Sequence, residues 1–140
     1  MTEADDVAIS WDDGVVVASL HGEIDIVNAA DVAQQLDAGV AGARLVIVDL
    51  TSVGFMDSQG IAMLDRLSGR LEGEGRGFAI VAPPAGPPRR VLEIVDLGIP
   101  LYDDRDAART ALSARAIGSS NGSVGGVAAP PSLADPSGSI

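Results

Sequence analysis

Residues 53–64, Val-Gly-Phe-Met-Asp-Ser-Gln-Gly-Ile-Ala-Met-Leu, lie where a strand is expected to end and a helix to begin. The residues directly before them, 45–50, are Leu-Val-Ile-Val-Asp-Leu, which is apolar enough for a buried central strand. Apolar residues then recur at helical spacing, at Ile61, Leu64, Leu67 and Leu71. This periodicity predicts a helix from about Ser58 to Leu71. Asp57 and Ser58 therefore lie at a helix N-terminus, where side-chain oxygens accept hydrogen bonds from unpaired backbone N–H groups.

Strands and helices alternate along the rest of the chain. Residues 7–11 and 14–20 are expected to form two short strands joined by Asp12-Asp13-Gly14, because Asp-Gly is a strong hairpin signal. Asn28 is expected to cap a helix whose apolar residues lie at 29, 32, 33 and 36. The same patterns predict strands at 78–82 and 99–102, and helices at 87–95, closed by Gly98, and at 103–115.

The order of these elements predicts the fold class. Two strands followed by alternating helices and strands indicate an α/β sandwich with a mixed sheet of four to five strands and about four helices. Residues 1–116 suit one compact domain. Beyond residue 117 the composition changes to Gly, Ser, Ala and Pro, and Asp135 is the only charged residue. We therefore expect residues 117–140 to form a flexible tail.

The composition limits the possible partners. The formal net charge is −11, which argues against binding to nucleic acid or to an anionic membrane surface. The chain has no cysteine, and therefore neither a disulfide nor a thiolate metal site. The acidic N-terminus lacks the layout of a signal peptide, and no apolar run reaches the roughly 20 residues of a membrane helix. The default expectation is a cytoplasmic protein.

Catalytic interpretations of the chain meet specific obstacles. A hydrolase with Ser58 as nucleophile would need glycine where Met56 stands, and His21 is the only histidine that could act as a base. A receiver domain with Asp57 as phosphoacceptor would need a lysine, and the chain has none. The glycines of residues 73–77 lead from a helix into a strand, which is typical of a helix stop and not of a phosphate-binding loop. We therefore expect no catalytic residue, no metal site and no cofactor.

Two motifs carry a resemblance to a known family. Residues 55–61, Phe-Met-Asp-Ser-Gln-Gly-Ile, resemble the phosphorylation-site segment of anti-sigma factor antagonists, the stand-alone STAS-domain proteins of bacteria. Residues 22–25, Gly-Glu-Ile-Asp, resemble the family's second motif, which follows its second strand. The resemblance covers roughly residues 5 to 115 and implies a STAS-type sandwich. Gln59 departs from the serine or threonine often found at its position.

The resemblance also implies a function. The unphosphorylated domain would bind an anti-sigma factor that is also a serine kinase, and would thereby release a sigma factor in a stress response. Phosphorylation of Ser58 would separate the complex, and a PP2C-type phosphatase would reset it. Asp57 would position the hydroxyl group, while Asp25 and Asn28 would line the docking surface.

Three further residues belong to the expected docking surface or its margin. Gln59 and Gly60 lie next to Ser58 in the motif. Met63 falls outside the apolar stripe of its helix, so it either packs at the margin of the core or contacts the partner.

Two alternatives to this function stay open at this stage. The domain could be a STAS scaffold in a stress-signalling assembly or a lipid-transport complex, where Ser58 is never modified. An enzyme of the serine hydrolase class would require both Ser58 and His21.

Overall fold

The structure is a computed structural model that describes residues 7–12 and 14–120, with only the backbone described for residues 12 and 115–120. The chain divides into two compact units, residues 1–109 and 110–140, and the first unit contains the whole sheet. The nine elements, in chain order, are β1 (Val7–Asp12), β2 (Val15–Ile24), α1 (Ala29–Gly39), β3 (Leu45–Met56), α2 (Ser58–Gly73), β4 (Gly77–Val81), α3 (Pro87–Val95), β5 (Leu101–Tyr102) and α4 (Arg105–Ser120).

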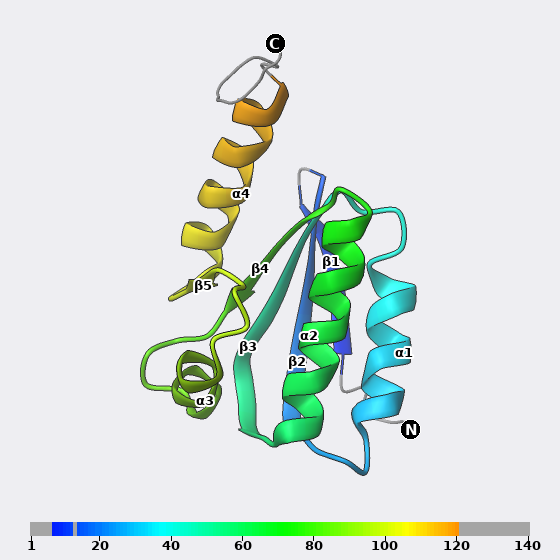
Figure 1. The fold of residues 1–140 in the computed structure, drawn as a ribbon, viewed down its shortest axis with the longest axis vertical. Coiled ribbons are helices and arrows are strands. Elements are labelled where there is room, and N and C mark those ends of the chain that lie inside the picture. Colours follow the sequence, from blue (N-terminus) through cyan, green and yellow to red (C-terminus); the bar gives the residue numbers. More distant parts are fainter. Residues whose placement is uncertain (1–6, 13, 121–140) are drawn as a thin grey trace. The chain divides into compact units, whose positions relative to one another are not determined.

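The sheet is mixed and has five strands in the order β1-β2-β3-β4-β5 (Figure 1). β1 pairs with β2 in antiparallel orientation, and the three other neighbouring pairs are parallel. Each parallel pair needs a crossover connection, which α1, α2 and α3 provide. The predicted α/β fold with a mixed sheet and four helices is confirmed.

One face of the sheet holds the main hydrophobic core. α1 and α2 lie side by side across this face (Figure 1). Val16 of β2, Val46 of β3 and Phe78 of β4 pair across the strands and belong to the core. Leu64 and Leu71 of α2 pack in the same core and are fully buried. Burying one such side chain stabilises a fold by about 1.5–3 kcal/mol, so the apolar stripe of α2 accounts for its position.

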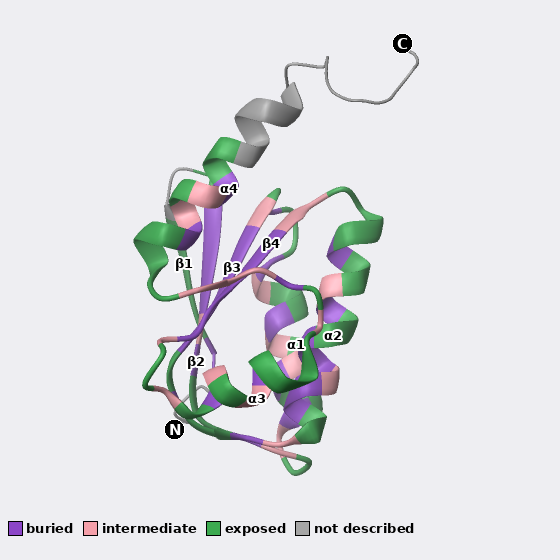
Figure 2. Cartoon of the chain, turned by 60° about the vertical axis from the view of Figure 1, so that its left-hand side comes forward, coloured by how far each residue is buried: buried purple, intermediate pink, exposed green. Residues whose placement is uncertain are grey.

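The central strands are buried on their other face as well (Figure 2). Val17, Ile47 and Ala79 pair across β2, β3 and β4 on this face, and each is at most 1% exposed. Such near-continuous apolar sequence is typical of parallel strands that are covered on both sides.

β2 and β3 are longer than predicted. β2 continues past Leu20 to Ile24, and β3 continues past Leu50 to Met56. The two extensions pair with each other, with register shifts between Ser19 and His21 and between Gly22 and Glu23. Gly22 has a φ of 81°, a conformation that glycine adopts without strain and that accommodates such an irregularity. The first three residues of the Gly-Glu-Ile-Asp motif therefore form the end of β2, and Asp25 follows it, so the expectation that the whole motif follows the strand was wrong.

The C-terminal elements also differ in detail from the prediction. Asp96, with a φ of 53°, caps α3 at its C-terminus, where Gly98 was expected to end the helix. α4 begins at Arg105 and continues to Ser120, past the predicted end at Arg115. Residues 117–120, which were expected in the tail, belong to α4, and the rest of the expected tail, 121–140, lies outside the described residues.

Candidate functional site

The site lies where β2 and β3 end. Ile24 and Met56 are the last residues that the two parallel strands pair. The carboxyl ends of parallel strands meet at one edge of a sheet, so the residues that follow each strand come together there. The backbone N–H of Asp57 donates a hydrogen bond of 3.1 Å to the carbonyl oxygen of Ile24, which joins the two motifs directly.

Asp57 is the N-cap of α2, as predicted. Its backbone is extended, with φ −99° and ψ −170°, and its Oδ1 accepts hydrogen bonds from the N–H groups of Gln59 at 2.9 Å and Gly60 at 3.3 Å. Its Oδ2 accepts a third bond, of 3.3 Å, from the N–H of Ile26 in the loop between β2 and α1. One carboxylate therefore fixes both the start of the helix and the neighbouring loop.

Ser58 is the first residue of α2, and its side chain is exposed. Within residues 7–12 and 14–120, the Ser58 hydroxyl takes part in no hydrogen bond. Gln59 beside it is exposed as well. Because the side chain of Asp57 accepts the capping hydrogen bonds, the hydroxyl group of Ser58 is not needed as a cap and remains accessible to another molecule.

The loop between β2 and α1 is closed by its own side chains. Asp25 Oδ1 accepts bonds from the N–H groups of Val27 at 2.9 Å and Asn28 at 3.4 Å. Asn28 Oδ1 accepts from the N–H of Asp25 at 3.0 Å, and Asn28 Nδ2 donates to the carbonyl oxygen of Glu23 at 2.7 Å. These bonds rigidify the loop that carries Asp25 beside Asp57.

The prediction that the Asn28 side chain caps α1 was wrong. Asn28 precedes the helix, but its side chain makes no capping hydrogen bond, because its Oδ1 accepts from Asp25 in the loop and its Nδ2 donates to Glu23 at the end of β2. The helix starts instead on backbone bonds, with Ala29 N–H donating to the carbonyl oxygen of Asp25 at 2.8 Å.

Gly60 is buried in the first turn of α2, where it packs against the ends of β2 and β3. A Cβ atom at Gly60 would lie 2.6 Å from Met56 Cγ, 3.1 Å from Ile24 Cγ2 and 3.3 Å from the carbonyl oxygen of Ile24. The missing side chain therefore lets the first turn of α2 approach the ends of both strands.

Met63 is 2% exposed and belongs to the hydrophobic core. Of the two roles considered for Met63, the structure favours packing. A side chain with so little accessible surface has almost nothing to offer a partner.

Three apolar residues near the site were not anticipated. Ile26 is 73% exposed, Val27 is 86% exposed and Phe55 is 49% exposed. We call these three residues the apolar rim. A usable signal was present in the sequence: Ile26 and Val27 are two apolar residues in the short connection between a motif and a helix. Exposed apolar residues that gather at one place are typical of protein interaction sites.

The alternative of a serine hydrolase finds no support in the geometry. His21 is exposed in β2, opposite Ser52, and no hydrogen bond links it to Ser58 among the described residues. The described part of the chain contains no group of three side chains suited to hold a metal ion. None of its helices is both long and apolar enough to span a bilayer.

Comparisons with known proteins agree with the two motifs. A family model described as "Mlab, STAS domain" matches residues 7–102. Over 77 residues the chain is 32% identical to the anti-sigma-F factor antagonist RsfB of Mycobacterium tuberculosis, and this match covers 54% of the chain and 62% of RsfB. The chain thus spans a little less than two thirds of this curated relative.

Solved structures show the same relationship. The crystal structure of an anti-sigma factor antagonist from Mycobacterium paratuberculosis is 35% identical with a TM-score of 0.68, covering 76% of this chain and 92% of that one. The phosphorylated form of the Bacillus cell fate determinant SpoIIAA shares the fold, with a TM-score of 0.56 at 19% identity over 82% of this chain and 99% of that one. Because the family model matches well over half of its residues, this chain belongs to the STAS-domain family, with anti-sigma factor antagonists among its homologues.

Proposed function

We propose that this protein is an anti-sigma factor antagonist that binds its anti-sigma factor through the surface around Ser58. The complex dissociates when Ser58 is phosphorylated. The observation that carries the proposal is the exposed, uncommitted hydroxyl of Ser58 at the N-terminus of α2, next to the apolar rim. Relatives named as anti-sigma factor antagonists support the same function.

The apolar rim would supply the attraction. Ile26, Val27 and Phe55 each expose apolar surface, and the backbone N–H groups of Ile26 and Val27 are already hydrogen-bonded within the chain. Burying apolar area contributes roughly 25 cal/mol per Å² of favourable free energy. A partner that covers these residues would therefore bind without leaving those polar groups unsatisfied.

A phosphate on Ser58 would act on the partner and not on the fold. It adds about −1.5 to −2 charges, and the N-terminus of a helix stabilises such an anion by about 0.3–1 kcal/mol. The new charge would stand close to the carboxylates of Asp57 and, across the loop, Asp25. A partner would therefore meet concentrated negative charge and extra bulk, and a loss of about 1.4 kcal/mol already lowers affinity tenfold.

The kinase in this proposal is the anti-sigma factor itself. Its ATP would donate the γ-phosphoryl group to Ser58 Oγ, the hydroxyl proton would leave, and ADP would be released. A PP2C-type phosphatase would hydrolyse the phosphoserine and return the protein to its binding form. The chain would work without a cofactor of its own.

Incubation with a cognate kinase and labelled ATP tests the proposal. We expect one phosphate per chain in the wild type and in Ser52→Ala, which removes another exposed serine, and none in Ser58→Ala. Labelling of Ser58→Ala at the wild-type level would refute Ser58 as the acceptor. A protein that binds partners through the same surface and never takes up phosphate would instead be a scaffold of a stress-signalling or lipid-transport assembly.

A further inference from the structure

The last turn of α3 exposes apolar surface that the Ser58 site does not explain. Ile94 is 76% exposed and Val95 is 46% exposed, while Pro88 and Leu92 on the inner side of the same helix are buried. Two exposed apolar residues in succession at the end of a helix offer a small apolar surface to another molecule.

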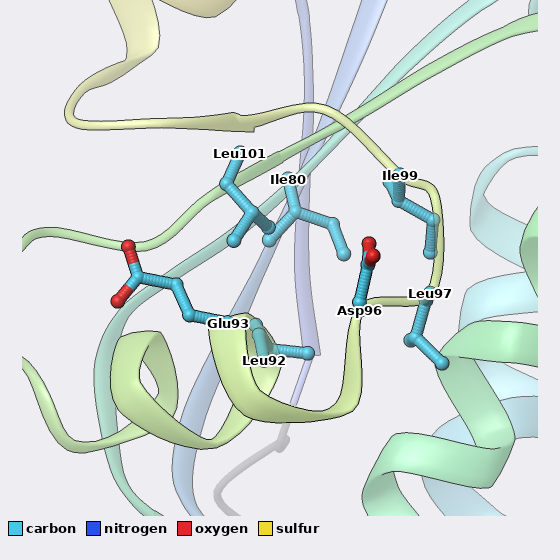
Figure 3. Close-up of a pocket in the computed structure, with 7 residues that line it drawn as sticks. All are labelled: Ile80, Leu92, Glu93, Asp96, Leu97, Ile99 and Leu101. Carbon is cyan, nitrogen blue, oxygen red and sulfur yellow. The ribbon is translucent and has the colours of Figure 1, made fainter.

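A pocket of about 220 Å³ adjoins this turn. Its lining comes from α3, β4, β5 and the segment between α3 and β5: Ile80, Leu92, Glu93, Asp96, Leu97, Ile99 and Leu101. Figure 3 shows Glu93 and Asp96 on two sides of the apolar group formed by Ile80, Leu92 and Leu101. Small-molecule sites usually measure about 300–1,000 Å³, so this pocket suits one long side chain better than a cofactor.

Asp96 places a carboxylate in the lining of the pocket. With a φ of 53°, Asp96 is the one non-glycine residue in the left-handed region among those the structure describes. Glycine usually occupies such a position after a helix because it carries no steric penalty there. The carboxylate of Asp96 is exposed, and within the described ranges it accepts only a bond of 3.4 Å from the N–H of Gly98. Glu93, in contrast, is paired with Arg89 at 2.9 Å.

We propose that the α3 pocket, together with Ile94 and Val95, is a docking site for a basic amphipathic segment of a protein partner. A lysine or arginine of that segment would lay its aliphatic stem along the apolar lining and place its cation at Asp96. Apolar neighbours in the segment would cover Ile94 and Val95. This site goes beyond the proposed switch and does not depend on the phosphorylation of Ser58.

Charge complementarity selects this occupant. The whole chain carries a net charge of −11, which attracts a basic segment and repels a second copy of the chain. Arg90 lies one helical turn before Ile94 and is exposed. The segment must therefore approach from the Asp96 end of the helix, with its cation away from Arg90.

Photo-crosslinking of the full chain in its native cell tests the site. The variant Ile94→p-benzoylphenylalanine should capture a partner, and the same substitution at Trp11, an exposed apolar residue of edge strand β1, should not capture it. Mass spectrometry of the crosslinked peptide should identify a segment with lysine or arginine among apolar residues. Crosslinking to a second copy of the chain, to an acidic segment, or to no protein would overturn the proposal.

A synthetic peptide with the crosslinked sequence then tests the charge. We expect Asp96→Gly to weaken its binding about tenfold, because the cation loses its carboxylate, and Arg90→Gln not to weaken it. Glycine relieves the backbone strain at this position, so Asp96→Gly should unfold at a temperature no lower than the wild type. Equal binding to the wild type and Asp96→Gly, or weaker binding to Arg90→Gln, would refute the assignment.

Discussion

At the residue scale, one carboxylate connects the two motifs of the site. Asp57 accepts hydrogen bonds from Gln59 and Gly60 in its own helix and from Ile26 in the loop after β2. The hydroxyl group of the neighbouring Ser58 makes none among the described residues. Of these two adjacent polar residues, Asp57 has a structural role, and the side chain of Ser58 is left exposed.

Replacing Asp57 should therefore cost stability, whereas replacing Ser58 should not. We expect Asp57→Ala to lower the free energy of unfolding by about 1 kcal/mol, the usual loss for an N-cap. Asp57→Asn keeps a capping oxygen and should lose less. Ser58→Ala, the matched control, should stay within about 0.5 kcal/mol of the wild type. Urea denaturation followed by circular dichroism measures all three, and a wild-type value for Asp57→Ala would contradict the capping role.

Gly60 and Gly69 offer a matched pair within α2. A methyl group at Gly60 would press against Met56 and the Ile24 carbonyl group, whereas one at Gly69 meets no atom within 4 Å. We expect Gly60→Ala to destabilise the protein by about 1–3 kcal/mol through overpacking. Gly69→Ala should stabilise it by about 0.5–1 kcal/mol, because alanine is the better helix former. Thermal unfolding of both variants is the measurement, and a Gly60→Ala variant as stable as the wild type or more stable would be inconsistent with close packing at Gly60.

At the scale of elements, a nearly buried carboxylate ties the first residue of α4 to the central strand. Asp49 of β3 is 5% exposed, and its Oδ1 accepts hydrogen bonds from the N–H of Thr51 at 2.9 Å and its hydroxyl at 2.5 Å. Its Oδ2 accepts from Nε of Arg105 at 2.5 Å, and Arg105 also donates to Ser19 Oγ in β2. Burial raises the pKa of Asp49, but the hydrogen bonds of Thr51 and Arg105 outweigh burial, so the pKa lies below its ordinary value.

This lowered pKa predicts how stability depends on pH. A carboxyl group with a lower pKa in the folded state stabilises the fold above its unfolded pKa of about 3.9, and this contribution disappears as the pH falls through the folded pKa. The advantage of the wild type over Asp49→Asn should therefore be constant at neutral pH and shrink below about pH 4. Arg105→Gln should move the loss of stability to higher pH, because it removes one of the groups that lower the pKa. Unfolding free energies across the acid range check this, and parallel profiles for the wild type and Asp49→Asn would count against it.

At the scale of the whole molecule, the proposed switch changes binding while the fold persists. Ser58→Glu places a negative charge at the N-terminus of α2, so its free energy of unfolding should stay within about 0.5 kcal/mol of the wild type or rise slightly. Its affinity for the anti-sigma factor should fall at least about tenfold, a loss of about 1.4 kcal/mol. Calorimetric titration beside thermal unfolding separates the two effects. Ser52→Glu, an exposed control in β3, should keep its affinity, and an unfolded Ser58→Glu variant would contradict the proposal.

Local periodicity was enough to predict most of the elements. The apolar spacing of α2 predicted a helix from 58 to 71, and the structure has Ser58–Gly73. The Asp57 cap was also predictable, because capping involves only the next few residues of the chain. The lengths of β2 and β3 were not predictable in this way, because Gly22, Glu23 and Gly54 in the extensions are residue types that are depleted in strands. The extensions are held by their pairing with each other across the sheet.

In the candidate site, too, the features that local sequence predicts differ from those that only the tertiary structure sets. The sequence by itself determined the α/β architecture, the helix start at Asp57 and the position of Ser58 within the motif, since these follow from patterns local to the chain. Only the tertiary structure decided that Asp57 also holds the Ile26 N–H, that Asn28 bonds within its loop, and that Met63 is buried. It alone also showed that Ile26, Val27 and Phe55, near the ends of β2 and β3, are exposed. The reason is physical. Parallel pairing of β2 and β3 brings together the ends of two strands that lie more than thirty residues apart in the sequence, and no local pattern encodes which side chains meet there.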